Sequence, residues 1–286
     1  MLNLVNQQIQ RIESDFRLYP VTASEIEFYL IGAQDSKVLP TFWEDVLNAC
    51  AQAGIALFNT GNEEGLEQYE VSLKPHSDPL KTVQDTLALK IILGEAAEDH
   101  SMKADFLAKP FADRSGSGLH IHVHLADDAG KNVFYKDDST MSDMLKHSIG
   151  GLLEWLPDCM AVFAPHAESY IRFITGGNAP TTVSWGANNR TVAVRLPMAA
   201  HENKHIEHRV SGADADPAAV MAVILAATHY GLTHKCDPGA QIFGDASLPM
   251  YDLPRLPATL EEATQRLTTS KKITDYFSVA DLLPAR

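Results

Sequence analysis

The sequence has few cysteines, and this limits the classes of protein to which it can belong. Cys50, Cys159 and Cys236 are odd in number and far apart, without the close spacing of a metal site or a redox motif. Small secreted scaffolds instead carry a dense set of paired cysteines. A disulfide-stapled scaffold is therefore excluded, and we expect a reducing compartment, the cytoplasm.

Basic residues and long apolar runs are also scarce. Lys and Arg number 23 against 37 Asp and Glu, for a formal net charge of −14. Nucleic acids and anionic membranes attract basic surfaces, so we expect neither as a partner. No apolar run reaches the ~20 residues that a membrane helix needs. The segment from Met1 to Phe16 is polar and has the pattern of an amphipathic helix, not of a signal peptide.

The 286 residues are long enough to bury a large core, and 45% of them are hydrophobic. Alternating patterns predict strands at about 23–31, 67–73, 101–107, 120–125, 181–186, 191–196 and 205–210. Helical spacing predicts helices at about 41–54, 82–97, 141–156, 158–163, 217–232 and 259–268, and a polar loop over 169–180. No repeat or linker divides the chain, so residues 1–286 are expected to form a single α+β domain.

Residues 115–125 read Ser-Gly-Ser-Gly-Leu-His-Ile-His-Val-His-Leu. The alternation predicts a strand that places His120, His122 and His124 on one face, at intervals of roughly 7 Å. Gly116 and Gly118 allow a sharp turn or a close approach to a ligand. A glycine-rich entry into a histidine-lined strand indicates an anion and metal site, although a polar sheet face with structural histidines has the same pattern.

Glu25 and Glu27 also share one face of a predicted strand. Two neighbouring carboxylates repel each other unless a cation or a basic group neutralises them. This pair is a second candidate for metal binding.

Several motifs follow one another in a defined order. They are Glu25-x-Glu27, Glu63-x6-Glu70, Gly116-Ser-Gly-x-His120-x-His122, Arg172 in a loop ending Ala179-Pro180, Asn189-Arg190 and Glu207-x-Arg209. Over residues 22–235 this order resembles the catalytic domain of the glutamine synthetase family, including its γ-glutamyl-amine ligase branch. The resemblance implies a curved antiparallel sheet with flanking helices and a metal funnel on its concave face.

The resemblance also implies the metal ligands. Glu27, Glu63 and Glu70 would hold the cation near glutamate. Glu25, His120 and Glu207 would hold the cation near the ATP phosphates. Five carboxylates and one imidazole suit Mg²⁺ or Mn²⁺ better than zinc.

Basic residues match the family's phosphate and carboxylate contacts. By resemblance, Arg172 would bind the glutamate carboxylate, Arg209 the transferring phosphate, and Arg190 the ATP phosphates. Arg195 and His122 would lie beside the nucleotide, with Gly116 where the backbone approaches the substrate. Guanidinium groups match carboxylate and phosphate oxygens in bidentate geometry. For Arg190 and Arg195 a surface salt bridge is the alternative, and for His122 a structural role.

The implied reaction has two steps. The γ-carboxylate of glutamate attacks the γ-phosphate of ATP, and an amine or ammonia then displaces phosphate from the acyl phosphate. The implied partners are small molecules: ATP, glutamate or a related acid, and an amine. A homo-oligomer of unspecified size is also expected.

Two departures from the family pattern concern the acceptor and the chain ends. Where glutamine synthetases carry a glutamate that helps to bind and deprotonate ammonium, this sequence has Asn178. A neutral amide offers no negative charge and no base, which favours a larger amine. Only about 21 residues precede the first motif, too few for the family's N-terminal β-grasp domain, and the C-terminal segment looks shortened.

Two other functions remain open at this stage. A catalytically weak or inactive relative could keep the fold for ligand binding or for assembly with a partner. Alternatively, an unrelated enzyme could use His120, His122 and His124 as a zinc site. Against the zinc site, three histidines on one strand face are spaced widely for a single ion.

Overall fold

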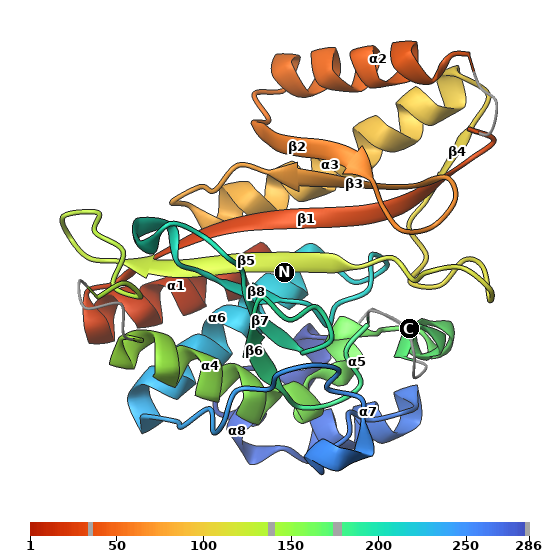
Figure 1. The fold of residues 1–286 in the computed structure, drawn as a ribbon. Helices are drawn as coiled ribbons and strands as arrows, with labels where there is room; N and C mark the ends of the chain where they lie inside the picture. Colours follow the sequence, from red (N-terminus) through yellow and green to blue (C-terminus); the bar gives the residue numbers. More distant parts are fainter. Residues whose placement is uncertain (34–36, 137–140, 174–178, 284–286) are drawn as a thin grey trace.

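The chain is described by a computed structural model that covers residues 1–33, 37–136, 141–173 and 179–283. A mixed sheet crosses the molecule, with β1 and β5 side by side at its centre and helices behind and below them (Figure 1). The strand order is β2-β3-β1-β5-β8-β7-β6, and β4 also pairs with β1. The α+β prediction of a sheet with flanking helices is confirmed.

The central strands are long and the later strands are short. The bounds are Tyr19–Ile31 (β1), Leu57–Asn62 (β2), Gln68–Leu73 (β3), Lys103–Asp105 (β4), Leu119–Ala126 (β5), Trp185–Ala187 (β6), Val194–Leu196 (β7) and Ile206–His208 (β8). Neighbouring strands pair antiparallel except β6 and β7, which are parallel.

The helices differ in length and position. Their bounds are Leu2–Phe16 (α1), Leu39–Gln52 (α2), Pro79–Asp99 (α3), Asp143–Trp155 (α4), Met160–Phe163 (α5), Pro217–His234 (α6), Leu260–Thr269 (α7) and Lys271–Thr274 (α8). Helix α3 packs on β1, whereas α6 packs against α1, α3 and α4 (Figure 1). Short 3₁₀ helices span Leu156–Asp158, Ala167–Phe173, His201–Asn203, Pro249–Tyr251 and Val279–Asp281.

The starts of α3 and α6 follow from local sequence. Asp78 and Asp216 each precede a proline, and each carboxylate accepts a hydrogen bond from a backbone N–H in the first turn. An acidic N-cap satisfies a free N–H group, and proline at the first helical position lacks the N–H that would otherwise be unpaired. These helices support the back of the sheet, and α6 is buried along nearly its whole length.

The sheet register places side chains from several strands beside one another. Glu25 on β1 is the cross-strand partner of His120 on β5, and Glu27 on β1 is the partner of Glu70 on β3. In the same way, His122 on β5 is the partner of Glu207 on β8. Cross-strand partners on one face have Cβ atoms roughly 4.5–5.5 Å apart, so the carboxylates and imidazoles converge.

Three local predictions were wrong. The loop predicted over 169–180 begins as a 3₁₀ helix, Ala167–Phe173, which is anchored by the 2.6 Å hydrogen bond from Ser169 Oγ to Asp214 Oδ2. The strands expected at 181–186 and 191–196 shorten to β6 and β7. Strands β6 and β7 also pair in parallel, so the predicted antiparallel sheet has one exception. The segment between them returns the chain to the end of the sheet at which β6 starts, and no hairpin forms.

One contiguous apolar cluster occupies the space between the sheet and the helices, and a small second cluster forms around Val192, Ile242 and Ala246. Within the described ranges, no helix is both long enough and apolar enough to cross a membrane.

Candidate active site

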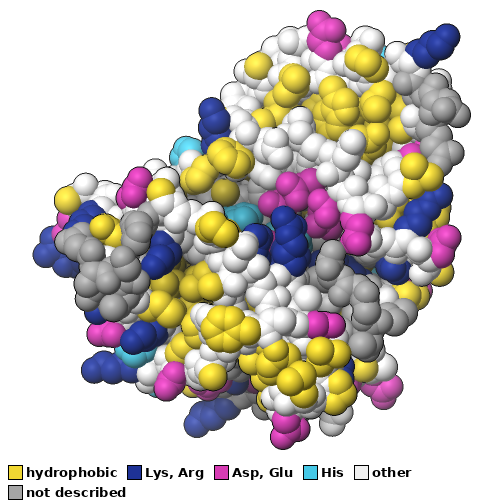
Figure 2. Space-filling view, in the orientation of Figure 1, with side chains coloured by type: hydrophobic (Ala, Val, Ile, Leu, Met, Phe, Trp, Pro, Cys, Tyr) yellow, Lys and Arg dark blue, Asp and Glu magenta, His cyan; other side chains and the backbone are white. Residues whose placement is uncertain are grey.

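Acidic side chains gather with basic residues and histidines in a hollow in the middle of one face of the molecule (Figure 2). The hollow lies over the central strands, between the part that carries α2 and the part that carries α4 and α7 (Figures 1 and 2). It is the place to which the register of β1, β3, β5 and β8 directs Glu25, Glu70, His120 and Glu207.

One group of possible metal ligands consists of Glu27, Glu63 and Glu70. Each offers a carboxylate oxygen, and these oxygens lie within 4.8 Å of one another. Burial, with the charges of Glu25, Glu27 and Glu63, raises the pKa of Glu70 to about 8. Burial and the charge of Glu27 likewise raise the pKa of Glu63. A cation nearby would favour the ionised form of each of these carboxyl groups.

The second predicted group, Glu25, His120 and Glu207, is divided between two possible ligand groups: Glu25, Glu27 and His120, and Glu25, His122 and Glu207. His120 Nδ1 lies 2.8 Å from Glu25 Oε1 and 3.6 Å from Glu207 Oε1. His120 Nε2 is buried, has no hydrogen-bond partner among the described residues, and lies 3.8 Å from Glu27 Oε1. This unpaired nitrogen among carboxylates is an available metal ligand.

His122 lies on the same face of β5 as His120 and is half-buried. Its Nε2 atom is 3.5 Å from Glu25 Oε2, and Glu25, His122 and Glu207 form another possible ligand group within 4.8 Å. Burial opposes protonation of His122, but the carboxylates of Glu25 and Glu207 raise its pKa above the usual value. The ring therefore belongs to the charged network at the entrance to the cavity described below.

The donor set decides which metals fit. Each possible group contains two or three carboxylates and at most one imidazole. Mg²⁺ and Mn²⁺ prefer such oxygen-rich sets, whereas zinc favours nitrogen and sulfur. In the part of the chain that the structure describes, no ligand group combines two of His120, His122 and His124, so the zinc alternative has no support.

The glycine segment before β5 is packed against the site. Gly118 N donates to Glu27 Oε2 at 2.6 Å, and Gln68 Nε2 donates to Gly116 O at 3.0 Å. A Cβ atom on Gly118 would lie 2.5 Å from His120 Nε2 and 2.8 Å from Arg172 Nη2. Gly118 thus permits a close approach of backbone, imidazole and guanidinium, while the close approach to a ligand expected from the sequence stays a prediction.

Arg172 is buried behind this segment. Its Nη1 donates to Val210 O at 2.7 Å and its Nη2 to Arg209 O at 3.3 Å, while Nε has no partner among the described residues. Burial lowers the pKa of Arg172 to about 10. The guanidinium therefore braces the backbone next to Arg209, and its Nε–H group is not used by the described residues.

Glu207 joins the arginines of β7 and β8. Arg195 Nη1 donates to Glu207 Oε2 at 2.7 Å, and Arg209 Nη1 donates to Glu207 Oε1. Although burial opposes ionisation, Arg209 and the neighbouring histidines hold the pKa of Glu207 at about 2. Glu207 is therefore an ionised group that fixes two guanidinium groups beside the possible metal ligands.

Two predicted residues remain, Arg190 and Asn178. Arg190 is exposed in the turn before β7, close enough to Glu63 for its charge to oppose the rise in the pKa of that carboxyl group. Asn178 lies outside the described residues.

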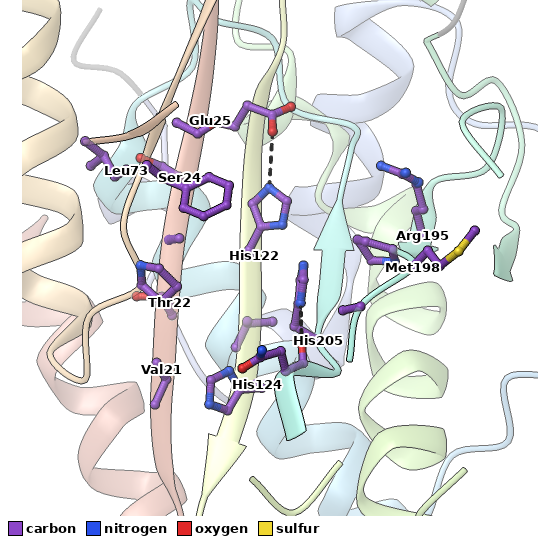
Figure 3. A pocket seen from close by; sticks show the side chains of 18 of the residues that line it. Val21, Thr22, Ser24, Glu25, Leu73, His122, His124, Arg195, Met198 and His205 are labelled. Carbon is purple, nitrogen blue, oxygen red and sulfur yellow. Dashed lines mark hydrogen bonds and ion pairs between the residues drawn. The ribbon is translucent and has the colours of Figure 1, made fainter. Parts of the chain in front are cut away.

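A cavity of about 530 Å³ opens beside the acidic cluster. Glu25, His122 and Arg195 line one part of it, and His124 and His205 line another (Figure 3). The exposed side chains of Phe58 and Met198 are also part of its wall. Its size is within the range of roughly 300–1,000 Å³ that is typical of small-molecule sites.

Four residues that the sequence did not mark as part of a site line this cavity: Phe58, His124, Met198 and His205. His205 is separated from Glu207 by one residue, so the alternation that placed Glu207 and Arg209 on one face also marked His205. No pattern marked Phe58 or Met198, because their position depends on how distant strands pack.

Comparison with known proteins identifies the class to which this fold and site belong. Residues 35–281 match the family described as glutamine synthetase, catalytic domain. The chain belongs to this family. The match begins after Glu25 and Glu27, so these two residues lie outside it.

Curated relatives include two amine ligases and several glutamine synthetases. The gamma-glutamylputrescine synthetase PuuA of Escherichia coli (strain K12) is 34% identical over 271 residues, covering 85% of this chain and 57% of the relative. The glutamate–isopropylamine ligase of a Pseudomonas species is 31% identical over 290 residues, covering 91% of this chain and 62% of the relative. This chain therefore spans about three fifths of the length of these relatives.

Solved structures confirm the fold. The chain is similar to GmaS in a complex with ADP, with a TM-score of 0.86 and 25% sequence identity, covering 98% of this chain and 70% of that one. The GmaS structure without ligand gives a TM-score of 0.85.

Proposed function

We propose that this chain is the catalytic domain of an ATP-dependent ligase that joins the γ-carboxylate of glutamate to an amine through a γ-glutamyl phosphate. The observation that carries the proposal is the convergence of Glu25, Glu27, Glu70, His120 and Glu207 beside Arg195 and Arg209. Similarity to two amine ligases supports the same reaction type.

The metal ligands are assigned to two cation positions, for Mg²⁺ or Mn²⁺. Glu27, Glu63 and Glu70 would hold one ion, and Glu25, His120 and Glu207 the other. Bound cations would neutralise negative charge on the phosphates and on glutamate during transfer. The Nε2 of His120, which faces Glu27, and the raised pKa of Glu70 support a cation within this cluster, because a cation would interact favourably with both.

The arginines would bind the anionic parts of the substrates. Arg209 and Arg195, fixed by Glu207, would bind the transferring phosphate and the nucleotide phosphates. Arg172 would bind the glutamate carboxylate with its Nε–H group, next to Gly116, and exposed Arg190 would close on the ATP phosphates. Because Glu207 holds two guanidinium groups in place, little reorganisation is needed as charge develops on the phosphoryl group.

The cavity beside the cluster would take the nucleotide. Its acidic and basic part, with Glu25, His122 and Arg195, suits metal-bound phosphates, and its remaining part suits an uncharged ring. Similarity to GmaS in its ADP complex supports an adenine nucleotide as the ligand.

An amine larger than ammonia is the proposed acceptor. Asn178 stands where the family's synthetases carry an ammonium-binding glutamate, and a neutral amide is no base. The two amine-ligase relatives are named for putrescine and isopropylamine. The cytoplasmic location and the homo-oligomer expected from the sequence stay predictions.

The test is phosphate release from ATP with Mg²⁺ or Mn²⁺ and glutamate, with each of ammonia, methylamine, isopropylamine, ethanolamine and putrescine. Turnover that needs both glutamate and one amine would establish the ligase and identify its acceptor. If ATP binds but no phosphate is released with any amine, the ligase proposal for this chain is wrong, and the alternative of a non-catalytic binding or assembly role is favoured.

A further inference from the structure

The two parts of the cavity beside the acidic cluster have different chemistry. Glu25 and Arg195 are charged and lie at one part, whereas His124 and His205 lie further along it (Figure 3). Metal-bound phosphates belong at the charged part. From His120 to His124 the strand advances by about 13 Å, at roughly 3.3 Å per residue, which leaves room for a nucleoside beyond the phosphates.

His205 presents a defined hydrogen-bonding atom to this cavity. Its Nδ1 lies 2.7 Å from the backbone oxygen of Asn203. A carbonyl oxygen only accepts, so Nδ1 carries the hydrogen. At pH 8, well above the ordinary imidazole pKa of about 6.5, Nε2 is then an acceptor with a free lone pair. Among the described residues, no hydrogen bond reaches Nε2.

The ring of His205 is held in place on a second side. Its centroid lies 5.2 Å from that of His122, with the ring planes tilted by 56°. Figure 3 shows the ring on edge, with His122 to one side and His124 further along the cavity. The acceptor is therefore fixed before a ligand arrives, which reduces the entropy lost on binding.

Part of the cavity wall is apolar and open. Phe58 is 73% exposed and Met198 is 83% exposed, and both line the cavity together with Leu73 and Pro197. Large apolar side chains that surround a cavity and remain this exposed indicate a ligand with flat apolar faces. A nucleobase has such faces and polar groups only around its edge.

We propose that His205 determines the base specificity of the nucleotide site: Nε2 accepts a hydrogen bond from the exocyclic 6-amino group of adenine. The inference rests on the proposed function, because it takes the cavity as the nucleotide site. A 6-oxopurine such as hypoxanthine or guanine places an oxygen lone pair against the lone pair of Nε2. A site built to bond one polar group rejects the analogue that leaves its own buried group unpaired.

The experiment compares ATP with inosine triphosphate, which differs from ATP only at the C6–N1 edge of the purine. Binding of each to the full chain is measured by calorimetry at pH 8 with Mg²⁺. The wild-type chain should bind ATP at least about tenfold more tightly than inosine triphosphate. In His205→Phe the two affinities should come within about twofold, through weaker binding of ATP. His205→Lys replaces the acceptor with a donor and should favour inosine triphosphate.

His147→Phe is the matched control. His147 Nδ1 also bonds a backbone oxygen, that of Cys236 at 3.1 Å, but it lies on α4 and does not line the cavity. Its nucleotide preference should equal that of the wild type.

The outcomes separate the two proposals. Equal wild-type affinities, or a preference unchanged in both His205 variants, would overturn the role of His205 and leave the nucleotide site in place. If the wild-type chain binds neither nucleotide, both the proposed nucleotide site and the role of His205 fall. If His205→Phe does not fold, the wild-type ratio and the reversal in His205→Lys still decide.

Discussion

His120 Nδ1 on β5 donates a 2.8 Å hydrogen bond to Glu25 Oε1 on β1, while Nε2 lies 3.8 Å from Glu27 Oε1 and has no hydrogen-bond partner within the described ranges. Glu25 and His120 are cross-strand partners, so the pairing is a direct consequence of the sheet register. A carboxylate that bonds one ring nitrogen sets the direction of the other, which is how metal-binding histidines are commonly oriented.

The first prediction concerns Glu70→Gln. This change removes one of four mutually repelling carboxylates, those of Glu25, Glu27, Glu63 and Glu70. In the absence of metal we expect the unfolding temperature to rise by about 2–4 °C, the shift that roughly 1 kcal/mol gives in a large domain. Affinity for Mn²⁺ should fall at least about tenfold, as measured by the rise in unfolding temperature on addition of the ion.

Exposed Glu95 on α3 provides the control for this variant. Glu95→Gln should leave both the metal-free stability and the response to Mn²⁺ unchanged. A Glu70→Gln variant that keeps the wild-type response to Mn²⁺ would contradict the ligand assignment.

The second prediction concerns pH. Glu70 has a pKa of about 8 in the folded chain against an ordinary value of 4.5, so between these values the folded state binds more protons than the unfolded state. Its contribution to stability therefore falls as pH rises from about 4.5 to 8. Urea midpoints at several pH values, with a chelator present, should show the wild type losing stability relative to Glu70→Gln over this window.

Glu207 acts in the opposite direction. Its pKa of about 2 in the folded chain is below the ordinary value of 4.5, so its stabilising contribution is present above pH 4.5 and is lost as pH falls towards 2.

Mn²⁺ provides a control for the Glu70 prediction. Added Mn²⁺ should remove the loss of stability that the wild type shows near pH 8 relative to Glu70→Gln. Parallel pH curves for the wild type and Glu70→Gln would exclude this explanation.

The third prediction concerns Glu207→Gln. The substitution removes the charge that pairs with Arg195 and Arg209 in a buried site. Removing one partner of a buried ion pair lowers the free energy of unfolding by about 3–5 kcal/mol. We expect a loss of stability near the lower end of this range, because glutamine still offers one acceptor oxygen. Urea unfolding measures this loss. Phosphate release from ATP should fall at least about 100-fold, since two arginines lose their position.

Exposed Glu202 offers a control close in the chain. Glu202→Gln should retain both stability and phosphate release. Wild-type turnover in Glu207→Gln would show that the site assignment is wrong.

The fourth prediction compares two glycines. In Gly118→Ala the new methyl group would meet His120 and Arg172 at less than 3 Å, so both side chains must move. We expect reduced stability and loss of the unfolding shift caused by Mn²⁺. In Gly94→Ala, inside α3, nothing lies within 4 Å of the new methyl group, and stability should rise by about 0.5–1 kcal/mol. Equal effects of the two changes on Mn²⁺ binding would argue against close packing at Gly118.

Local patterns in the sequence account for much of the fold. The alternation of His120, Ile121 and His122 identified β5, and the apolar residues of that strand are buried as expected. Proline after an acidic residue marked the start of α6. These features depend on residues close together in the chain, where side-chain periodicity and caps act directly.

Local patterns failed where an element depends on distant partners. The strands β6 and β7 pair in parallel, and Arg172 lies in a 3₁₀ helix instead of a loop. Arg172 is held there by the backbone oxygen of Val210, 38 residues further along the chain. A contact over that separation has no periodic signature in the sequence.

By itself, the sequence determined which residues are candidates for the site, because carboxylates, imidazoles and guanidiniums in a family-like order are visible in it. The tertiary structure alone decided how they combine. It placed His120 Nε2 among carboxylates, used Glu207 to hold Arg195 and Arg209, and set His205 at the wall of the cavity. The reason is physical: strand register and packing, not sequence spacing, bring atoms from β1, β3, β5 and β8 within a few ångströms.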